Sequence, residues 1–317
     1  MTIQETAEFL LSHDNYLILT HVRPDGDTVG CAAGLCRALR EQGKTAHILP
    51  NPGASAIFTP YLEGLVAPEG FEPDTVVAVD IAARSMFYEE ALPWLDRVDL
   101  TIDHHPSQEF YAKQTCLDGS RAACGEIVYD ILRCWGPVSK EVALPLYVAV
   151  STDCGCFVYS NTNPNTHRVA AALMEAGADY RRLNKKHFRT KTMARMRLES
   201  LMLWEMYLYH EGSGAVVPIS LALMAEAGAS EQDAEDIAAF VGQIAGVRHS
   251  ATIRELRPGE CKISLRTAAD LNASPVCARL GGGGHAAASG CTVKGSVAEA
   301  ECAIVGAIDA QMEETDM

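Results

Sequence analysis

The sequence predicts an α/β protein with a parallel-sheet domain, a helical linker and a smaller α/β domain. Short apolar runs alternate with segments of helical periodicity in the first half, which is the pattern of βαβ units. Two of these runs, Thr75–Asp80 and Val98–Asp103, are largely apolar up to a final aspartate, as is typical of central parallel strands. Further along, the composition turns basic and the alternation gives way to a hairpin pattern. We therefore place the three parts at residues 1–187, 188–210 and 211–317.

The elements of the first part follow from apolar periodicity and from turn residues. Tyr16–His21 has the length of a buried strand, and the helical periodicity of Thr28–Glu41 ends at Gly43, a residue that commonly follows a helix. The other expected elements are strands at Thr45–Leu49, Thr75–Asp80 and Val98–Asp103, and helices at Ala122–Trp135, Ser139–Thr152 and Thr166–Ala176. Because parallel strands end at one edge of a sheet, the residues that follow these strands should lie close together.

The second part begins with a different pattern. A long amphipathic helix is expected at Arg189–His210, where the first domain gives way to the second. Thr252–Leu256 and Glu260–Thr267 flank a Pro-Gly turn and have the pattern of a β-hairpin. The remaining expected elements are strands at Ala215–Ile219 and Cys291–Val293, a helix at Glu231–Gln243 and a final helix from Val297.

The composition is that of a globular protein. Of the 317 residues 48% are hydrophobic, yet no uncharged apolar run approaches the roughly 18 residues that a membrane span needs. The amino terminus lacks the basic flank and apolar core of a signal peptide. Eleven cysteines without a CxxC pair fit reduced thiols, so we expect a cytoplasmic protein. The net charge of −15 argues against a protein that coats nucleic acid through a basic face, but it is compatible with a small anionic substrate.

Side chains of the kind that bind metals follow several predicted elements. They are His21, Asp25, Asp27, Asp80, Asp103, His104, His105 and Asp153. Five carboxylates and three imidazoles at one sheet edge require compensating cations, because like charges a few ångströms apart repel strongly. Oxygen and imidazole ligands without thiolate favour Mn²⁺, Mg²⁺ or a related ion over structural zinc. We expect two ions that share one carboxylate and a water, an arrangement that serves in-line phosphoryl displacement.

The spacing of these residues resembles that of DHH-family phosphoesterases. The matching motifs are HxxPDxD at 21–27, a strand-end aspartate at 80, DHH at 103–105 and a helix-end aspartate at 153. The resemblance implies two divalent ions, expected to be Mn²⁺ with Mg²⁺ or Co²⁺ as alternatives. It implies that one ion is held by His21, Asp25 and Asp80, and the other by Asp27, Asp80, His104 and Asp153.

The same resemblance implies roles for the rest of the DHH motif. Asp103 would orient an imidazole, and His105 would face the substrate phosphate as a hydrogen-bond donor or proton source. Together with the bridging Asp80, these residues are the expected catalytic set. After Asp153 the chain has Cys154 where relatives usually have threonine, and we interpret this cysteine as a packing residue before a ligand.

The second domain extends the resemblance. Its glycine run and the histidine that follows resemble the GGGH signature of the DHH-associated domain, and the strand that carries Arg266 resembles the phosphate-binding strand of that domain. Glycines allow a ligand to approach backbone N–H groups, and an arginine can bind a phosphate through two hydrogen bonds. The substrate-binding residues that the resemblance implies are Arg266, Gly282, Gly283, Gly284 and His285.

The predicted function is that of a Mn²⁺-dependent phosphoesterase of the nanoRNase type. Its expected substrates are short oligoribonucleotides (nanoRNA), 3′-phosphoadenosine 5′-phosphate (pAp) or both, cleaved to mononucleotides. A phosphodiesterase for linear pApA or cyclic dinucleotides is the alternative within the family. A non-catalytic nucleotide-binding module is the alternative outside it, and the complete ligand set disfavours that reading. The expected partner is a short RNA or nucleotide, with no membrane and no stable protein partner, and a homodimer is left open.

Overall fold

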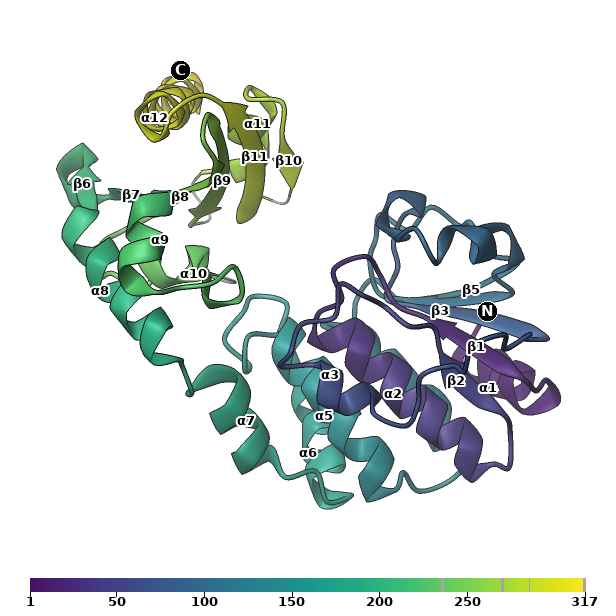
Figure 1. The fold of residues 1–317 in the computed structure, drawn as a ribbon. Helices are drawn as coiled ribbons and strands as arrows, with labels where there is room; N and C mark the ends of the chain where they lie inside the picture. Colours follow the sequence, from purple (N-terminus) through teal and green to yellow (C-terminus); the bar gives the residue numbers. More distant parts are fainter. Residues whose placement is uncertain (235–236, 269–270, 285, 316–317) are drawn as a thin grey trace. The chain divides into compact units, whose positions relative to one another are not determined.

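The fold is described by a computed structural model that covers residues 1–234, 237–268, 271–284 and 286–315. The chain forms two units, Met1–Thr190 and Lys191–Met317, each built around its own sheet (Figure 1). Within the described ranges, every helix is too short or too polar to cross a membrane.

The first unit is built on a five-stranded parallel sheet with the order β2-β1-β3-β4-β5. Its strands are β1 (Tyr16–Leu19), β2 (Ala46–Ile48), β3 (Thr75–Val79), β4 (Leu100–Asp103) and β5 (Gln114–Leu117). The chain builds outward from β1 to β2 and then crosses back to β3 on the other side of β1. The carboxyl ends of β1 and β3 therefore flank the point where the strand order reverses, which is where open α/β sheets bind ligands.

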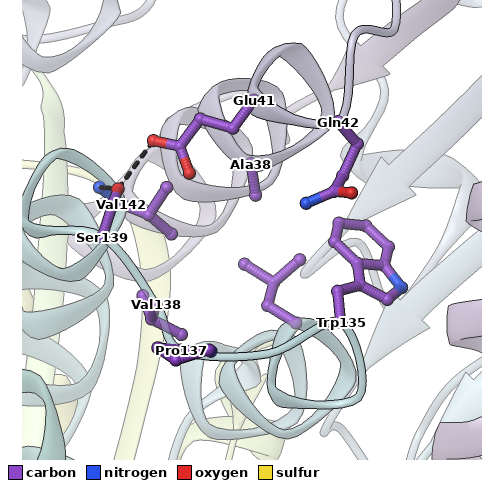
Figure 2. A pocket seen from close by; sticks show the side chains of 9 residues that line it. Ala38, Glu41, Gln42, Trp135, Pro137, Val138, Ser139 and Val142 are labelled. Atoms are coloured by element: carbon purple, nitrogen blue, oxygen red, sulfur yellow. Dashed lines mark hydrogen bonds between the residues drawn. The ribbon is translucent and has the colours of Figure 1, made fainter.

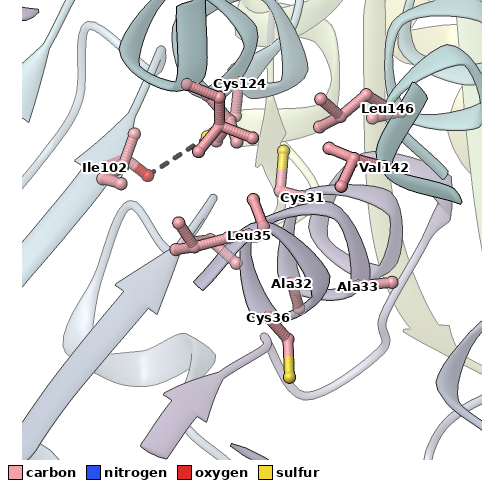
Figure 3. Packing of buried hydrophobic residues seen from close by; sticks show 14 of the residues in the cluster. Cys31, Ala32, Ala33, Leu35, Cys36, Ile102, Cys124, Val142 and Leu146 are labelled. Carbon is pink, nitrogen blue, oxygen red and sulfur yellow. Dashed lines mark hydrogen bonds between the residues drawn. The ribbon is translucent and has the colours of Figure 1, made fainter. Parts of the chain in front are cut away.

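Helices cover one face of this sheet. They are α1 (Ile3–Ser12), α2 (Gly26–Glu41), α3 (Thr59–Leu62), α4 (Cys124–Arg133), α5 (Lys140–Asp153), α6 (Pro164–Glu175) and α7 (Tyr180–Phe188). Tyr16 and Ile18 of β1 point into the helical core, whereas Leu17 and Leu19 pack against the connection after β3. In the helical core, Cys124 of α4 donates its thiol proton to the Ile102 carbonyl at 3.2 Å (Figure 3). The alternation places both faces of the central strands in apolar surroundings.

Helices α2 and α5 lie side by side (Figure 1) and approach each other closely at glycines. A Cβ atom at Gly30 would collide with the Pro145 carbonyl and lie 2.8 Å from the Cβ of Ala149. A Cβ at Gly26, the first residue of α2, would meet the Thr152 side chain. Helix α2 thus begins two residues earlier than expected, and Gly26 lies at its contact with α5. This packing brings the carboxyl end of α5 to the amino end of α2.

The second unit contains a six-stranded mixed sheet with the order β10-β11-β9-β8-β7-β6, in which only β7 and β8 are parallel among the described residues. Its strands are β6 (Tyr207–Tyr209), β7 (Gly214–Ile219), β8 (His249–Arg257), β9 (Glu260–Thr267), β10 (Gly283–Gly284) and β11 (Ala288–Lys294). Its helices are α8 (Met193–Glu205), α9 (Leu221–Ala227), α10 (Ala238–Val241), α11 (Ala273–Ala278) and α12 (Val297–Thr315). Val216 of β7 packs on the α11–α12 side and Val217 on the α8–α9 side, so helices cover both faces.

Two predicted helices of this region are only partly confirmed. The helix expected at Arg189–His210 is the shorter α8, because Thr192 caps its start and Tyr207–Tyr209 pair with β7 as a strand. The helix expected at Glu231–Gln243 is a turn of 3₁₀-helix followed, beyond the undescribed residues 235–236, by the four-residue α10. Asp233 accepts a hydrogen bond from the backbone N–H of Ser230, and such a local side-chain bond competes with a helix. It also accepts a hydrogen bond from the distant Thr192.

Helices α1, α3 and α7 and strand β5 of the first unit were not predicted. Helix α1 has a capping box in which Thr2 and Glu5 bond each other's backbone N–H groups. Strand β5 lies at the sheet edge and is only partly buried, so its sequence lacks the apolar run of a central strand. The strands and helices that were predicted for the first unit, and the β8–β9 hairpin of the second, are confirmed with ends shifted by a few residues.

Candidate active site

The structure brings the predicted metal ligands of the first unit to one edge of the sheet. Among the described residues, three groups have ligand atoms that all lie within 4.8 Å of one another. These groups are His21 with Asp25 and Asp80, Asp27 with His104 and Asp153, and Asp80 with His104 and His105. The three groups overlap at Asp80 and His104, so they form one continuous cluster.

The first group joins the ends of β1 and β3 to the start of α2. His21 Nε2 lies 3.5 Å from Asp25 Oδ1 and 3.8 Å from Asp80 Oδ2. Asp25 is the N-cap of α2, and its Oδ1 accepts the backbone N–H groups of Asp27 at 2.9 Å and Thr28 at 3.2 Å. The Asp25 side chain is 55% exposed, so this side of the cluster is open to solvent.

The second group joins α2, β4 and α5. His104 Nε2 lies 3.8 Å from Asp27 Oδ2, 3.6 Å from Asp80 Oδ1 and 3.7 Å from Asp153 Oδ2. Three carboxylate oxygens around one imidazole nitrogen, at distances too long for hydrogen bonds, leave room for an ion among them. Asp153 reaches the cluster because it is the last residue of α5.

Asp80 connects the two groups. Its Oδ2 faces His21 and its Oδ1 faces His104. The Oδ1 atom is buried and has no hydrogen-bond partner among the described residues, an arrangement that is costly unless a ligand completes it. The backbone of Asp80 has φ = +59°, in the left-handed region that non-glycine residues seldom adopt. Such strain is concentrated at functional sites. The donor set and the uncompensated oxygen both fit a pair of divalent ions.

The charges of the cluster show the same need for cations. Burial raises the pKa values of Asp27 and Asp80 well above the ordinary range, and the neighbouring carboxylates raise them further. Burial and the charge of Asp25 raise the pKa of Asp153 to about 7. Desolvation opposes ionisation of Asp25 too, but the His21 imidazole and the α2 amides outweigh it and lower its pKa. Bound cations would favour the ionised form of all four carboxylates.

The two histidines of the DHH motif are oriented by different partners. His104 Nδ1 donates to the Arg121 carbonyl at 3.1 Å, which leaves the lone pair of Nε2 directed at the carboxylates of the cluster. Burial, with the nearby His105, lowers the pKa of His104 and favours the neutral ring. His105 Nδ1 donates to Asp103 Oδ1 at 2.8 Å. Although burial opposes it, the Asp103 carboxylate raises the pKa of His105.

Asp103 lies beneath the cluster and anchors the turn that carries both histidines. Its Oδ1 also accepts the backbone N–H groups of His104 at 2.7 Å and His105 at 3.2 Å. Its Oδ2 accepts a hydrogen bond from Gln108, which in turn bonds the Ile81 carbonyl. Gln108 was not predicted, since a glutamine in a loop gives no sequence signal of this role.

Asp27 is held by the start of helix α4, a contact that was not predicted from the sequence. The backbone N–H of Cys124 donates to Asp27 Oδ2 at 2.7 Å, and that of Gly125 donates to Oδ1 at 2.9 Å. The thiol of Cys31 donates to the same Oδ1 at 3.2 Å. Helix α4 receives no cap from its own N-cap residue, Ala123, so Asp27 supplies one.

Cys154 packs in the core, as expected. Its thiol accepts the backbone N–H of Phe157 at 3.3 Å, and burial raises its pKa to about 11. A protonated, buried thiol is a poor metal ligand. None of the candidate metal groups in the described part of the chain contains this residue.

Arg266 and the glycines Gly283 and Gly284, predicted to bind substrate, lie on strands β9 and β10, which flank β11 in the sheet of the second unit. Arg266 of β9 pairs with Ala288 of β11, and Gly284 of β10 pairs with Ser289 of the same strand. A Cβ at Gly282 would collide with the Gly290 carbonyl, so close strand contact explains this glycine without a ligand. Gly283 has open space where its side chain would be. His285 lies outside the described residues.

A small hollow elsewhere in the first unit is unrelated to the cluster (Figure 2). Glu41 and Gln42 line it from the carboxyl end of α2, and Ser139 and Val142 from the start of α5. Asp27 is at the other end of α2, which at 1.5 Å per residue is about 20 Å away. The hollow therefore cannot hold a substrate of the cluster.

Comparison with known proteins matches each unit to a family of domains. Residues 15–150 match the family model described as DHH family, N-terminal domain, and residues 215–314 match the DHHA1 domain. A Thermus thermophilus protein named bifunctional oligoribonuclease and PAP phosphatase NrnA is 32% identical over 88% of this chain and 84% of its own length. The Bacillus subtilis protein of the same name is 24% identical over 89% of this chain and 90% of its own length.

A solved structure shows the same fold. An exopolyphosphatase-related protein from Bacteroides fragilis superposes with a TM-score of 0.89 at 24% identity, over 99% of this chain and 97% of that chain. The family models cover every member of the metal cluster except Asp153, which lies just beyond the first match, and they cover Arg266 of the second unit. The chain therefore belongs to the DHH family of phosphoesterases and carries a DHHA1 domain after its DHH domain.

Proposed function

We propose that the chain is a two-metal phosphoesterase that cleaves short oligoribonucleotides and pAp to mononucleotides. The observation that carries the proposal is the buried carboxylate of Asp80, which faces His21 with one oxygen and His104 with the other. The names of the Thermus and Bacillus relatives support the choice of substrates.

The proposed ions would be Mn²⁺, with Mg²⁺ or Co²⁺ as alternatives. His21, Asp25 and Asp80 would hold one ion, and Asp27, Asp80, His104 and Asp153 the other. When bound, such a pair of ions activates water and neutralises the charge of a reacting phosphate. The mixture of imidazole nitrogen and carboxylate oxygen supports Mn²⁺, which accepts both ligand types.

The protein's own groups would bind the substrate and supply a proton. We assign this role to His105, because Asp103 holds its Nδ1 and raises its pKa, so that Nε2 can carry a proton toward the phosphate. Its side chain is 31% exposed, so a substrate can reach it. Arg266 would bind a second phosphate of the substrate. Gly283, where no side chain blocks the backbone, supports the assignment of the glycine run.

The cellular setting is part of the same proposal. All eleven cysteines are free thiols, which supports the cytoplasm as the location. The proposal needs no protein partner, and a size measurement in solution distinguishes a monomer from a homodimer.

One set of assays tests the function. The purified chain is freed of metal with a chelator, supplied with Mn²⁺, Mg²⁺ or Co²⁺, and incubated with pAp, pApA, RNA of two to five nucleotides and pyrophosphate. We expect hydrolysis of pAp and of the short RNAs with Mn²⁺. Turnover of pApA alone would favour the dinucleotide alternative, and binding without turnover of any substrate would favour the non-catalytic module.

A further inference from the structure

The segment Arg121–Gly125, which leads from β5 into α4, contacts two members of the second metal group directly. The Arg121 carbonyl accepts the Nδ1 proton of His104 at 3.1 Å. The backbone N–H groups of Cys124 and Gly125 donate to the two oxygens of Asp27 at 2.7 and 2.9 Å. The segment therefore fixes both the ring of His104 and the carboxylate of Asp27.

The third member, Asp153, is tied to the same segment through one side chain. The amide of Asn161 donates to the Ala122 carbonyl at 3.0 Å and to the Asp153 carbonyl at 3.2 Å. A displacement of the segment would therefore also affect the end of α5.

The side chain of Arg121 clamps this segment between three carboxylates. Its Nε lies 2.8 Å from Asp118 Oδ2, just before the segment, and its Nη2 lies 2.7 Å from Asp130 Oδ2 on α4. Its Nη1 lies 3.7 Å from Glu126 Oε2, which is fully buried. The Arg121 side chain is only 19% exposed, so these contacts are partly shielded from solvent. The planar guanidinium can contact all three carboxylates at once, which a lysine cannot do.

His21 and Asp25, the two members of the first metal group that are not shared with the second site, are held by other parts of the fold. Asp25 is fixed by the amides of its own helix, and the His21 carbonyl accepts a hydrogen bond from Asn51 at 2.8 Å. Among the described residues, no hydrogen bond or ion pair joins the segment 121–125 to either His21 or Asp25.

We infer that Arg121 is a positioning residue for one of the two metal sites, the site formed by Asp27, His104 and Asp153. Through the backbone of residues 121–125 it sets the geometry of these ligands and hence the affinity of that site, while the site of His21 and Asp25 does not depend on it. The inference rests on the two-ion proposal above. Loss of a group that orients metal ligands typically weakens metal binding by about 10- to 100-fold.

The test is a Mn²⁺ titration of the metal-free protein, with free Mn²⁺ counted by electron paramagnetic resonance, so that the result does not depend on activity. The variants are Arg121→Gln and Arg121→Lys, and Asp130→Asn removes one partner of the clamp with less disturbance of the fold. Arg133→Gln is the matched control, since Arg133 lies on the same helix, is exposed and donates a hydrogen bond to the Gly136 carbonyl, away from the metal cluster. Thermal unfolding of the metal-free proteins is measured alongside.

In the wild type we expect two bound Mn²⁺. Arg121→Gln should weaken one of the two binding steps by about 10-fold or more and leave the other within about twofold, with smaller effects in Arg121→Lys and Asp130→Asn and none in Arg133→Gln. Equal weakening of both steps, or unchanged binding with a lower unfolding temperature, would overturn the inference in favour of a purely structural role. If Arg121→Gln does not fold, Asp130→Asn decides by the same criteria. In each of these cases, hydrolysis of pAp or RNA by the wild-type protein would still support the proposed function.

Discussion

Asp103 holds His105 by its Nδ1 atom at 2.8 Å and is itself completely buried. The carboxylate therefore controls both the direction of the ring and its charge, because Asp103 raises the pKa of His105 against the effect of burial. A carboxylate that orients an imidazole in this way acts on the reaction without contacting the substrate.

The replacement Asp103→Asn should lower kcat by about 10- to 100-fold. It should also move the pH profile, because His105 loses the carboxylate charge that raises its pKa. The rate that depends on protonated His105 should then decline at a lower pH in the variant than in the wild type. The measurement is kcat against pH with pAp under saturating Mn²⁺. Asp96→Asn, at a 92% exposed side chain of the same unit, is the control and should match the wild type. An unshifted profile would remove the proton-carrying role from His105.

A second prediction distinguishes Asp80, which would bind both ions, from His21, which would bind one. Asp80→Asn should impair both ions, because Asp80 faces both groups, whereas His21→Ala should impair one. We expect Asp80→Asn and His104→Ala to lose Mn²⁺-dependent hydrolysis almost completely, by about 10³-fold or more if both ions contribute to the reaction. Bound Mn²⁺ is counted after desalting. Full activity of either variant would disprove the metal assignment.

The cluster could be predicted from the sequence because its residues stand at the ends of recognisable elements. Asp80 and Asp103 end apolar strands, and a parallel sheet places such ends together whatever the rest of the fold does. The packing that aims these groups was not visible. Cys124 reaches Asp27 only after α4 has packed beside α2, and a backbone N–H donor has no side-chain signature.

The errors in the second unit have a related cause. Tyr207–Tyr209 continue a helical pattern locally, but they gain backbone hydrogen bonds by pairing with β7. Strand pairing in the tertiary structure therefore overrides the local preference of these residues for a helix. The short α10 and the edge strand β5 are likewise fixed by their neighbours, since neither carries a long periodic pattern of its own.

A third prediction tests the contact between α2 and α5. Gly30→Ala should destabilise the first unit by about 1–3 kcal/mol, because the added methyl group would meet Pro145 and Ala149 in a packed interface. Gly306→Ala is the matched control within α12, where nothing lies within 4 Å of the added carbon. There alanine should stabilise the helix by about 0.5–1 kcal/mol. Urea unfolding measures both. A neutral Gly30→Ala would mean that the two helices can separate without cost.

A fourth prediction concerns stability against pH. Nε2 of His187, on α7, accepts a 2.7 Å hydrogen bond from the Tyr61 hydroxyl when the ring is neutral, and the ring stacks on Phe58 with a centroid distance of 5.5 Å. Burial, with the charge of Lys186, lowers the pKa of His187 from 6.5 to about 4. The unfolded chain therefore binds a proton between these values that the folded chain does not. This contribution to stability is complete above pH 6.5 and is lost as the pH falls toward 4.

The loss should reach at most about 2 kcal/mol between pH 6.5 and 5, since each unit of pKa shift corresponds to 1.36 kcal/mol and His187 is partly exposed. His187→Phe keeps the ring against Phe58 but cannot titrate, so the free energy of unfolding should fall less steeply with decreasing pH in this variant. His13→Gln, at an exposed histidine that stacks on Phe9, should retain the wild-type slope. The measurement is urea unfolding of the metal-free proteins across this range, so that titration of the metal cluster contributes equally to all three. If His187→Phe and the wild type show parallel curves, the histidine is already protonated in the folded state. The Tyr61 hydroxyl would then act as acceptor of that hydrogen bond and not as its donor.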